Sequence, residues 1–292
     1  MSPRLRVVAA SVLFSTGGAA IKLCAFGPWQ LAAGRAVIAA AAMIVLIPEA
    51  RRGWSWRAPF VGVAYAGAGL LLIFANKLTT AASAIFIQAT NPLFILALAP
   101  VLVHERVTRR DLEYMLVLAG GMALLLSAPG RRFATAPNPF VGNVLAAGCA
   151  VSWALTVIGY RWVARRGVGG HGAVAAAAVS GNAIVFLTAL PLALPFASGT
   201  PRDWLVVAYL GVFQLALAYV FLSRAITHVR ALEVALVGLV EPVLAPIWAW
   251  LVHGETPGLR AVMGGIVILA ATAWHAWREP PGVLVPAPAL EG

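Results

Sequence analysis

The sequence predicts an all-α polytopic membrane protein, with ten transmembrane helices forming two inverted five-helix repeats around a central cavity. Three observations favour this fold class. Of the 292 residues, 61% are hydrophobic and only 11% are charged, whereas an ordinary soluble domain carries about 25% charged residues. Long apolar stretches recur along the whole chain. Two distant segments also resemble each other at a constant offset.

The length of the apolar stretches indicates helices. Backbone polar groups in lipid must be paired internally, so only helices and closed barrels can span a membrane. Barrel strands alternate apolar and polar residues over about ten positions, whereas these stretches are continuous and approach the roughly 20 residues that a helical span needs. The expected spans are 5–22, 29–48, 58–76, 81–103, 112–128, 140–160, 173–196, 204–223, 231–252 and 259–277.

The first span has two interpretations. Arginines precede an apolar run, which is also the pattern of a signal peptide. However, Ser11, Ser15, Gly18 and Lys22 lie on one helical stripe, as expected for a bundle helix with an inward face. We therefore expect a retained first helix.

The distribution of basic residues predicts the topology. Loops on the side of the two termini hold Arg4, Arg6, Arg51, Arg52, Arg57, Arg106, Arg109, Arg110, Arg161, Arg165, Arg166, Arg224, Arg230 and Arg278. The opposite side holds Lys22, Lys77, Arg131, Arg132, Arg202 and Arg260, and Arg35 lies within the second span. This asymmetry is typical of the positive-inside rule. It predicts a multi-pass protein of a bacterial inner membrane with both termini in the cytoplasm, and it explains the net charge of +11 without a nucleic-acid partner.

The internal repeat divides the chain into two halves. "NPLFILALAPVLVHE" (91–105) aligns with "EPVLAPIWAWLVHGE" (241–255), so that Pro92 matches Pro242 and Glu105 matches Glu255. The halves are expected at 1–130 and 139–278, and the Pro-rich segment 279–292 is expected to be a disordered tail.

An odd number of spans in each half makes the repeat inverted, because the second half must enter the membrane from the opposite side. Inverted repeats are typical of secondary transporters, which bind substrate near the membrane centre at the repeat interface. A duplication without transport is the alternative.

At these residues the chain resembles the drug/metabolite transporter superfamily, and within it the EamA-type exporters. The resemblance covers 5–278, and its most specific parts are "VEPVLAPIWAWLVHGE" (240–255) and "ANKLTTAASAIFIQATNP" (75–92). In general appearance it is similar to the bacterial aromatic amino-acid exporter group. Leu78 departs from the pattern, because many relatives carry an aromatic residue there, and it changes one wall of the expected cavity.

The resemblance implies a small-molecule exporter that hydrolyses no ATP, with a cavity lined by helices 1, 3, 4, 6, 8 and 9. The chain itself contains no "GxxxxGK[ST]" motif. We expect a small-molecule substrate and membrane lipid as partners. No ATPase subunit is expected, and a monomer could function because it holds both repeats.

Glu241 is the main candidate binding residue, because ionisable side chains at mid-span usually face a cavity or one another. It could bind a substrate ammonium group or carry a coupling proton. Equally, it could cap backbone groups that Pro242 leaves free, since proline removes a helix hydrogen bond. Pro92 and Pro242 are expected hinge positions.

Several polar residues are further candidates for substrate binding. Gln88 and Asn91 lie three residues apart and share a helix face, which could line the cavity or hydrogen-bond between helices. Asn76 could instead be a helix-end partner. Ser15 and Thr156 are small hydroxyl residues for which bonding to their own helix backbone is the favoured alternative.

Trp153 lies at mid-span, unlike the tryptophans near the expected interfaces, and could either pack or form an aromatic cavity wall. Gln214 and Tyr219 are five residues apart, about 140° around an α-helix, so we do not expect both to face the centre. Gln214 is the preferred candidate of the two. For Arg35 we favour a pair with an acidic side chain or a backbone carbonyl.

The sequence thus predicts an exporter of small organic metabolites, amino acids first, that works by alternating access. Proton coupling through Glu241 is one hypothesis and facilitated diffusion is the other. A membrane enzyme is not expected, because the sequence shows no "HExxH", CxxC or Ser-His-Asp arrangement, and we expect neither cofactor nor metal. A sensor or scaffold without transport is the remaining alternative.

Overall fold

The computed structural model describes residues 2–102, 108–127, 134–164, 170–196, 199–226 and 238–278. These ranges are almost entirely helical. Within them, eight helices are long and apolar enough to cross a membrane. The all-helical polytopic fold is therefore confirmed, and the expected tail 279–292 lies outside the described residues.

The helices follow the expected spans, some of them in pieces. The first half consists of α1 (Pro3–Ser15), α2 (Gly17–Leu23), α3 (Pro28–Leu46), η1 (Pro48–Arg51), α4 (Arg57–Leu78), α5 (Ala81–Gln88), α6 (Asn91–Leu102) and α7 (Arg109–Leu126). The second half consists of α8 (Pro139–Ala164), α9 (Gly170–Ala193), α10 (Pro201–Tyr209), η2 (Leu210–Leu217), α11 (Ala218–Ile226), α13 (Val240–His253) and α14 (Leu259–Arg278). Spans one and four are each divided by a break, and span eight is a continuous helix that contains the π-helical segment η2.

Two expected spans are not among the eight, for different reasons. The fifth is α7, whose first turn is rich in charge: Arg109, Arg110, Asp111 and Glu113. Thr108 and Asp111 cap this turn reciprocally, so it suits the membrane boundary. For the ninth span, residues 231–237 lie outside the described part, and α13 alone remains.

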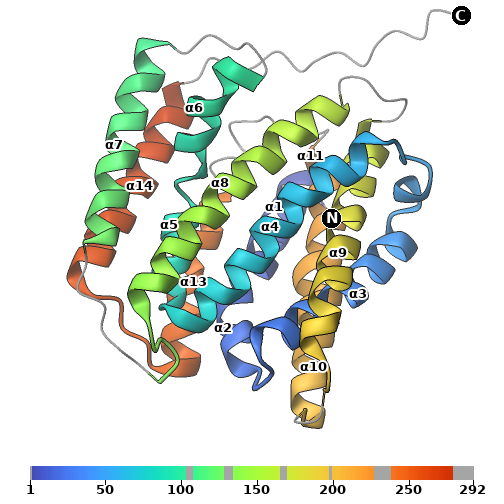
Figure 1. Cartoon of the computed structure of the whole chain (residues 1–292). Helices are drawn as coiled ribbons and strands as arrows, with labels where there is room; N and C mark the ends of the chain where they lie inside the picture. The colour runs from blue at the N-terminus through green and yellow to red at the C-terminus, as the bar shows by residue number, and fades with distance from the viewer. Residues whose placement is uncertain are drawn as a thin grey trace, which may run out of the picture.

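The packing relates the two halves by a pseudo-two-fold rotation (Figure 1). The pairs α3–α9, α5–α13 and α7–α14 each join equivalent helices of the two halves. The contact between α4 and α8 corresponds to the contact between α11 and α1. In the same way, the contact between α4 and α9 corresponds to the contact between η2 and α3. Exchanging the halves therefore preserves the contacts. With five spans in each half, this is the inverted repeat that the sequence predicts.

The first span is an integral part of the bundle. α1 packs against α11 and α13. Ser11 and Ser15, which belong to its polar stripe, are buried. The stripe therefore does face inward, as the sequence predicts.

Glycines allow α7 and α14 to pack closely against each other. A Cβ atom on Gly264 would lie 2.8 Å from the carbonyl oxygen of Gly121. Small residues permit such approach of two backbones in a membrane bundle.

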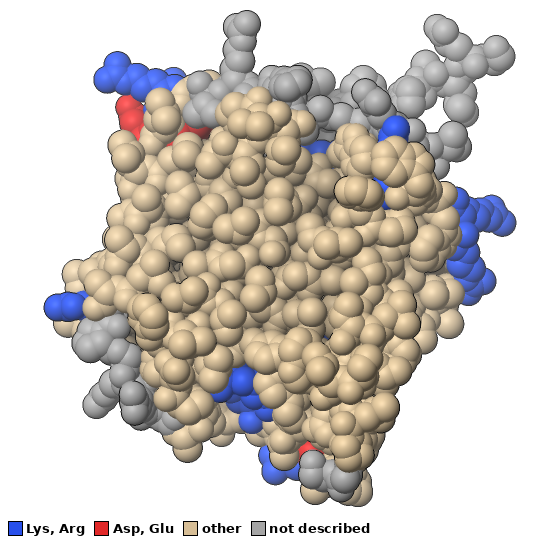
Figure 2. Space-filling model, viewed as in Figure 1, with Lys and Arg blue, Asp and Glu red and all other residues tan. Residues whose placement is uncertain are grey.

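The surface is suited to lipid. Figure 2 shows a broad uncharged area across the centre of the visible face, with Lys, Arg, Asp and Glu at its edges. Large apolar side chains are exposed on the molecule, among them Phe60 and Leu116. Such exposure would be unfavourable in water, whereas lipid accommodates it.

Candidate binding cavity

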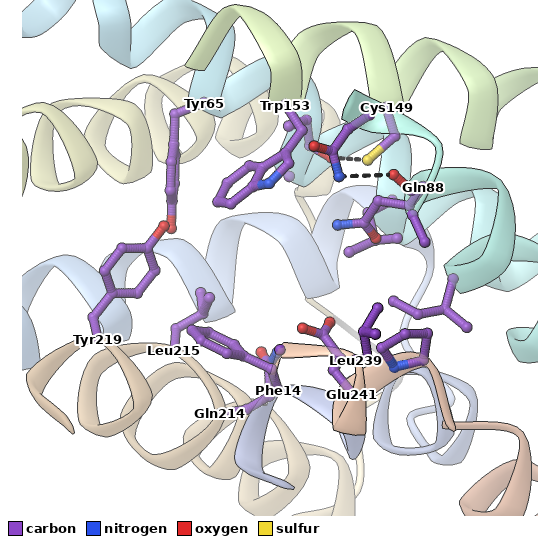
Figure 3. A pocket seen from close by; sticks show the side chains of 18 of the residues that line it. Phe14, Tyr65, Gln88, Cys149, Trp153, Gln214, Leu215, Tyr219, Leu239 and Glu241 are labelled. Carbon is purple, nitrogen blue, oxygen red and sulfur yellow. Dashed lines mark hydrogen bonds between the residues drawn. The ribbon is translucent and has the colours of Figure 1, made fainter. Parts of the chain in front are cut away.

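A cavity of about 260 Å³ lies between the two halves and is lined by both. α1, α3, α4 and the α5–α6 region contribute from the first half, and α8, η2, α11 and α13 contribute from the second. Seven of the ten residues proposed from the sequence line it: Gln88, Asn91, Pro92, Trp153, Gln214, Glu241 and Pro242. Figure 3 shows several of these side chains pointing toward one another across the open space.

A helix begins beside the cavity in each repeat. Span four stops at Gln88 and restarts as α6 at Asn91, with Pro92 in second position. Proline fits the start of a helix, because the first N–H groups have no partner within the helix. α13 likewise begins at Val240, two residues before Pro242. Both prolines thus lie where a helix begins beside the cavity.

Glu241 occupies the first turn of α13, and its carboxylate points into the cavity (Figure 3). The positive end of the helix dipole favours a negative charge at this position. Its carboxylate forms no hydrogen bond or ion pair with any other residue in the described ranges. In particular, it does not cap backbone groups near Pro242.

Two glutamine side chains lining the cavity keep free acceptor atoms. The Oε1 atoms of Gln88 and Gln214 are buried and have no hydrogen-bond partner among the described residues. Asn91 donates from Nδ2 to the carbonyl oxygen of Gln88 at 3.2 Å, which stabilises the break between α5 and α6. Both glutamine side chains thus border the cavity with a buried acceptor that has no partner among the described residues.

Gln214 and Tyr219 both line the cavity, so the expectation that only one of them faces the centre is wrong. The physical reason is η2, which is a π-helix over Leu210–Leu217. Its i→i+5 bonds widen the turn and bring residues five apart toward one face. π-helical turns also occur frequently at functional sites.

Aromatic side chains form one wall. The Tyr65 ring lies 6.3 Å from that of Trp153 and 6.2 Å from that of Tyr219, and the Phe14 ring lies edge-on to Tyr219 at 5.8 Å. Asn182 donates from Nδ2 to the Tyr65 hydroxyl at 3.3 Å. Trp153 thus both packs and lines the cavity.

Ser15, Asn76 and Thr156 lie outside this lining. Ser15 Oγ donates to the carbonyl oxygen of Val12 at 2.7 Å and accepts from Trp248 Nε1 at 3.0 Å. Thr156 Oγ1 donates to the Ser152 carbonyl at 2.8 Å. Asn76 Nδ2 donates to the Leu72 carbonyl at 3.0 Å. Each thus bonds its own helix backbone.

Arg35 also lines the cavity, although the sequence analysis favoured a structural pair for it, and Phe14 and Tyr65 are lining residues that the sequence analysis did not propose. Arg35 is only 7% exposed, and it lines the cavity from α3. It forms no ion pair or hydrogen bond with another described residue. Its position as a lone cation at mid-span is the signal that could have identified it.

Polar contacts join several chain segments at one end of the bundle. We call this end the Lys22 end; α2 and α4 end there, and α5, α8 and α10 begin there. Lys22 forms an ion pair with Glu255. The backbone N–H of Ala25 donates to Asp203 Oδ1 at 2.6 Å. Glu255 lies in the loop between α13 and α14, as the sequence predicts, but it is buried there and joins three segments. Its repeat counterpart Glu105 lies outside the described residues.

A transmembrane helical bundle with an inverted repeat and a cavity between its halves defines a class of membrane transport proteins. The pattern of the EamA-like transporter family matches residues 4–127 and 140–276, once in each half. The chain therefore belongs to the EamA-like transporter family, within the drug/metabolite transporter superfamily, which is not a family of enzymes.

Similar proteins agree with this assignment. An uncharacterized transporter of Clostridium kluyveri is 24% identical over 204 residues, which cover 68% of this chain and 64% of the relative. The pseudopaline exporter CntI of Pseudomonas aeruginosa is 34% identical over 91 residues, covering 30% of this chain and 32% of the relative. An uncharacterized transporter of Archaeoglobus fulgidus is 34% identical over 90 residues, covering 31% and 32%. The matches thus span less than two thirds of each relative.

A solved structure has the same overall fold. This crystal structure, described only as that of a protein, superposes with a TM-score of 0.64 at 25% sequence identity. The superposition covers 94% of this chain and 98% of the other.

Proposed function

We propose that this chain is a secondary transporter that exports small organic metabolites, most of all neutral or aromatic amino acids, by alternating access. The observation that carries this proposal is one cavity built by both inverted repeats, next to a helix start in each of them. Rocking of the two halves about such a site is how inverted-repeat carriers alternate access. Because one chain supplies both halves, a monomer without an ATPase subunit suffices.

The lining supports a substrate of amino-acid size. Pockets for larger organic ligands run from about 300 to 1,000 Å³, and this cavity measures about 260 Å³. Glu241 could bind an amine. The aromatic wall of Phe14, Tyr65, Trp153 and Tyr219 suits an apolar or aromatic body.

The proposal includes a bacterial inner-membrane location with the termini in the cytoplasm. On that topology the Lys22 end faces outward. Its closure by Lys22–Glu255 and Asp203–Ala25 then corresponds to a carrier that is closed to the outside.

A second candidate substrate class is another metabolite or drug. The name of the similar Pseudomonas aeruginosa protein, a pseudopaline exporter, favours it. Export is common to both candidate substrate classes. They differ in the chemical groups that the lining residues would have to bind.

Counterflow in proteoliposomes tests the proposal. Purified protein is reconstituted, the interior is loaded with one unlabelled amino acid, and uptake of the labelled compound is followed for each of a panel. Saturable uptake that depends on the loaded compound is expected, and protein-free liposomes are the control. Absence of uptake for every amino acid, with folded protein, would exclude the amino-acid proposal; uptake of other metabolites would support the second candidate.

A further inference from the structure

A second hollow, separate from the central cavity, runs along the surface contact between α4 and α8, which lie side by side in Figure 1. We call it the α4–α8 groove. It has a volume of about 840 Å³ and shares no lining residue with the central cavity. Because α4 belongs to the first half and α8 to the second, the groove follows a seam between the two repeats.

The groove is an apolar channel that opens to the surroundings of the bundle. The two helices approach closely at its base, where a Cβ atom on Gly159 would lie 2.8 Å from a methyl carbon of Val61. Phe60, Val63 and Leu155 also line the groove, and the first two are 71% and 62% exposed. In a membrane, this channel would be filled by lipid.

The end of the groove that lies away from the Lys22 end is aromatic and basic. Trp162 lines the groove there, and its ring centre is 5.7 Å from that of Trp56. The Arg57 guanidinium lies 4.9 Å from the ring centre of Trp162 and 5.4 Å from that of Trp56. A guanidinium that stacks on aromatic rings keeps its in-plane N–H groups for a phosphate. Tryptophan at a helix end is typical of the headgroup level of a membrane.

The same end carries an excess of positive charge. In the described segments 47–60 and 158–164, the acidic residue is Glu49, and the basic residues are Arg51, Arg52, Arg57 and Arg161. Basic residues close to the membrane surface attract anionic lipids. The charge therefore favours an anionic headgroup at the mouth of the groove.

The length of the groove fits one membrane leaflet. On α4 the lining extends from Pro59 to Gly67, which corresponds to about 12 Å of helix rise. The hydrocarbon core of a bilayer is roughly 30 Å thick, so one leaflet is about 15 Å. A basic mouth followed by an apolar channel of this length matches the polarity of a phospholipid.

The repeat counterpart of the groove is narrower. It lies between α2, α10 and α13, and Val252 lines it at the repeat offset of 150 from Leu102, which lines the α4–α8 groove. Its volume is about 350 Å³. The hydroxyls of Thr16 and Tyr209, which both line it, share a hydrogen bond of 2.8 Å. The α4–α8 groove is therefore the seam with more room for a lipid chain.

We propose that the α4–α8 groove binds an anionic phospholipid, with an acyl chain along Val63 and Leu155 and the phosphate at Arg57. The bound lipid contacts both repeats at once and so stabilises the folded bundle, as any ligand of the native state does. This inference goes beyond the proposed transport function and does not depend on it.

Three probes separate the headgroup from the chain. Phosphatidylglycerol is anionic, phosphatidylcholine with the same acyl chains has no net charge, and sn-glycerol 3-phosphate has the phosphate without the chains. Native mass spectrometry measures their binding to the purified, delipidated full chain. Wild type is expected to bind phosphatidylglycerol about five-fold more tightly than phosphatidylcholine, as one basic residue near a headgroup provides, and to bind glycerol 3-phosphate least.

Substitutions test the mouth and the channel separately. Arg57→Gln is expected to abolish the preference for phosphatidylglycerol and to leave phosphatidylcholine binding unchanged. Arg52→Gln is the matched control, because Arg52 is exposed at the same end and does not line the groove. Val63→Trp is expected to weaken the binding of both lipids, because its ring occupies the path of the chain. Leu116→Trp is its control, at a 74% exposed position of α7 outside the groove.

Cross-linking locates the lipid in wild type and does not depend on the folding of any variant. Phosphatidylglycerol with a diazirine on one acyl chain is expected to label peptides of α4 and α8, and absence of label from both would overturn the inference. Equal loss of the lipid preference in Arg57→Gln and Arg52→Gln would indicate diffuse surface attraction instead of a site. Equal effects of Val63→Trp and Leu116→Trp would exclude the groove as the path of the chain.

Two further results would assign the site differently. A dimer that Val63→Trp dissociates would show that a second copy of the chain covers the groove. Binding of glycerol 3-phosphate as tight as that of phosphatidylglycerol would show that the acyl chain contributes nothing. Counterflow is measured independently, so failure of the lipid site leaves the transport proposal standing, and absence of counterflow leaves the lipid site standing.

Discussion

Lys22 and Glu255 form a buried ion pair, with Lys22 Nζ 2.8 Å from Glu255 Oε1 and side-chain exposures of 1% and 2%. Lys22 also donates to the carbonyl oxygen of Thr79 at 2.7 Å, and Glu255 accepts from the backbone N–H of Ala81 at 3.0 Å. Thr135 Oγ1 donates to the same carboxylate at 2.5 Å. The pair therefore connects the end of the first span to the α4–α5 turn, the segment before α8 and the segment after α13.

Removing one partner of this pair should destabilise the protein. Lys22→Met and Glu255→Gln should each lower the free energy of unfolding by about 3–5 kcal/mol, since the remaining group is left buried and unpaired. The double variant Lys22→Met/Glu255→Leu should recover part of the loss. Thermal unfolding in detergent measures all three.

The exposed pair Arg109–Glu113 provides the control. Its atoms are 3.8 Å apart and its side chains are 93% and 63% exposed. Glu113→Gln should cost less than about 1 kcal/mol. If the Lys22 and Glu255 variants were as stable as Glu113→Gln, the ion pair would have no structural role at this end.

The same closure should protect Cys24 from solvent. Cys24 is 2% exposed, and Lys77 Nζ donates to its carbonyl oxygen at 2.5 Å. In a Cys149→Ser background, Glu255→Gln should accelerate the modification of Cys24 by a membrane-impermeant maleimide, because the Lys22 end opens more often. Mass spectrometry of the labelled chain measures the rate. An unchanged rate relative to Glu113→Gln would show that the ion pair does not limit access.

Gly69 should tolerate a large side chain that fills the cavity. It lines the cavity, and a Cβ atom there meets no atom within 4 Å. Gly69→Phe should therefore fold normally and abolish counterflow, because the ring occupies the substrate volume. Gly120→Phe is the matched control, since Gly120 is exposed and its Cβ also meets nothing within 4 Å. Full counterflow in Gly69→Phe would place the substrate elsewhere.

Glu241 should carry the coupled proton if export is driven by the proton gradient. The other titratable groups that line the cavity in the described part are Arg35, Tyr65, Tyr219 and Cys149. Glu241→Gln should abolish acceleration of transport by an imposed pH gradient while retaining some counterflow, which needs no net proton movement. Unchanged transport and unchanged pH dependence in the variant would exclude Glu241 as the proton carrier, and a wild type without pH dependence would indicate facilitated diffusion.

The sequence by itself determined the membrane class, the approximate spans and the internal duplication. The membrane class and the spans follow from local composition, because an apolar stretch of sufficient length must cross lipid as a helix. The duplication follows from the similarity of two distant segments. Pro92 and Pro242, which the sequence pairs at one offset, both lie in the first turn of a helix beside the cavity. Inversion then followed from the odd number of spans in each half.

The tertiary structure alone decided which polar side chains share the cavity. Ser15 and Thr156 were candidates from the sequence like Gln88, yet their hydroxyls bond the backbone of their own helices and lie outside the cavity lining. Gln214 and Tyr219 face one space because a π-helix changes the turn between them. Arg35 lines the same cavity, and within the described helices no acidic side chain forms an ion pair with it. The direction of a side chain depends on the rotation and packing of whole helices, which hydrophobic periodicity does not encode.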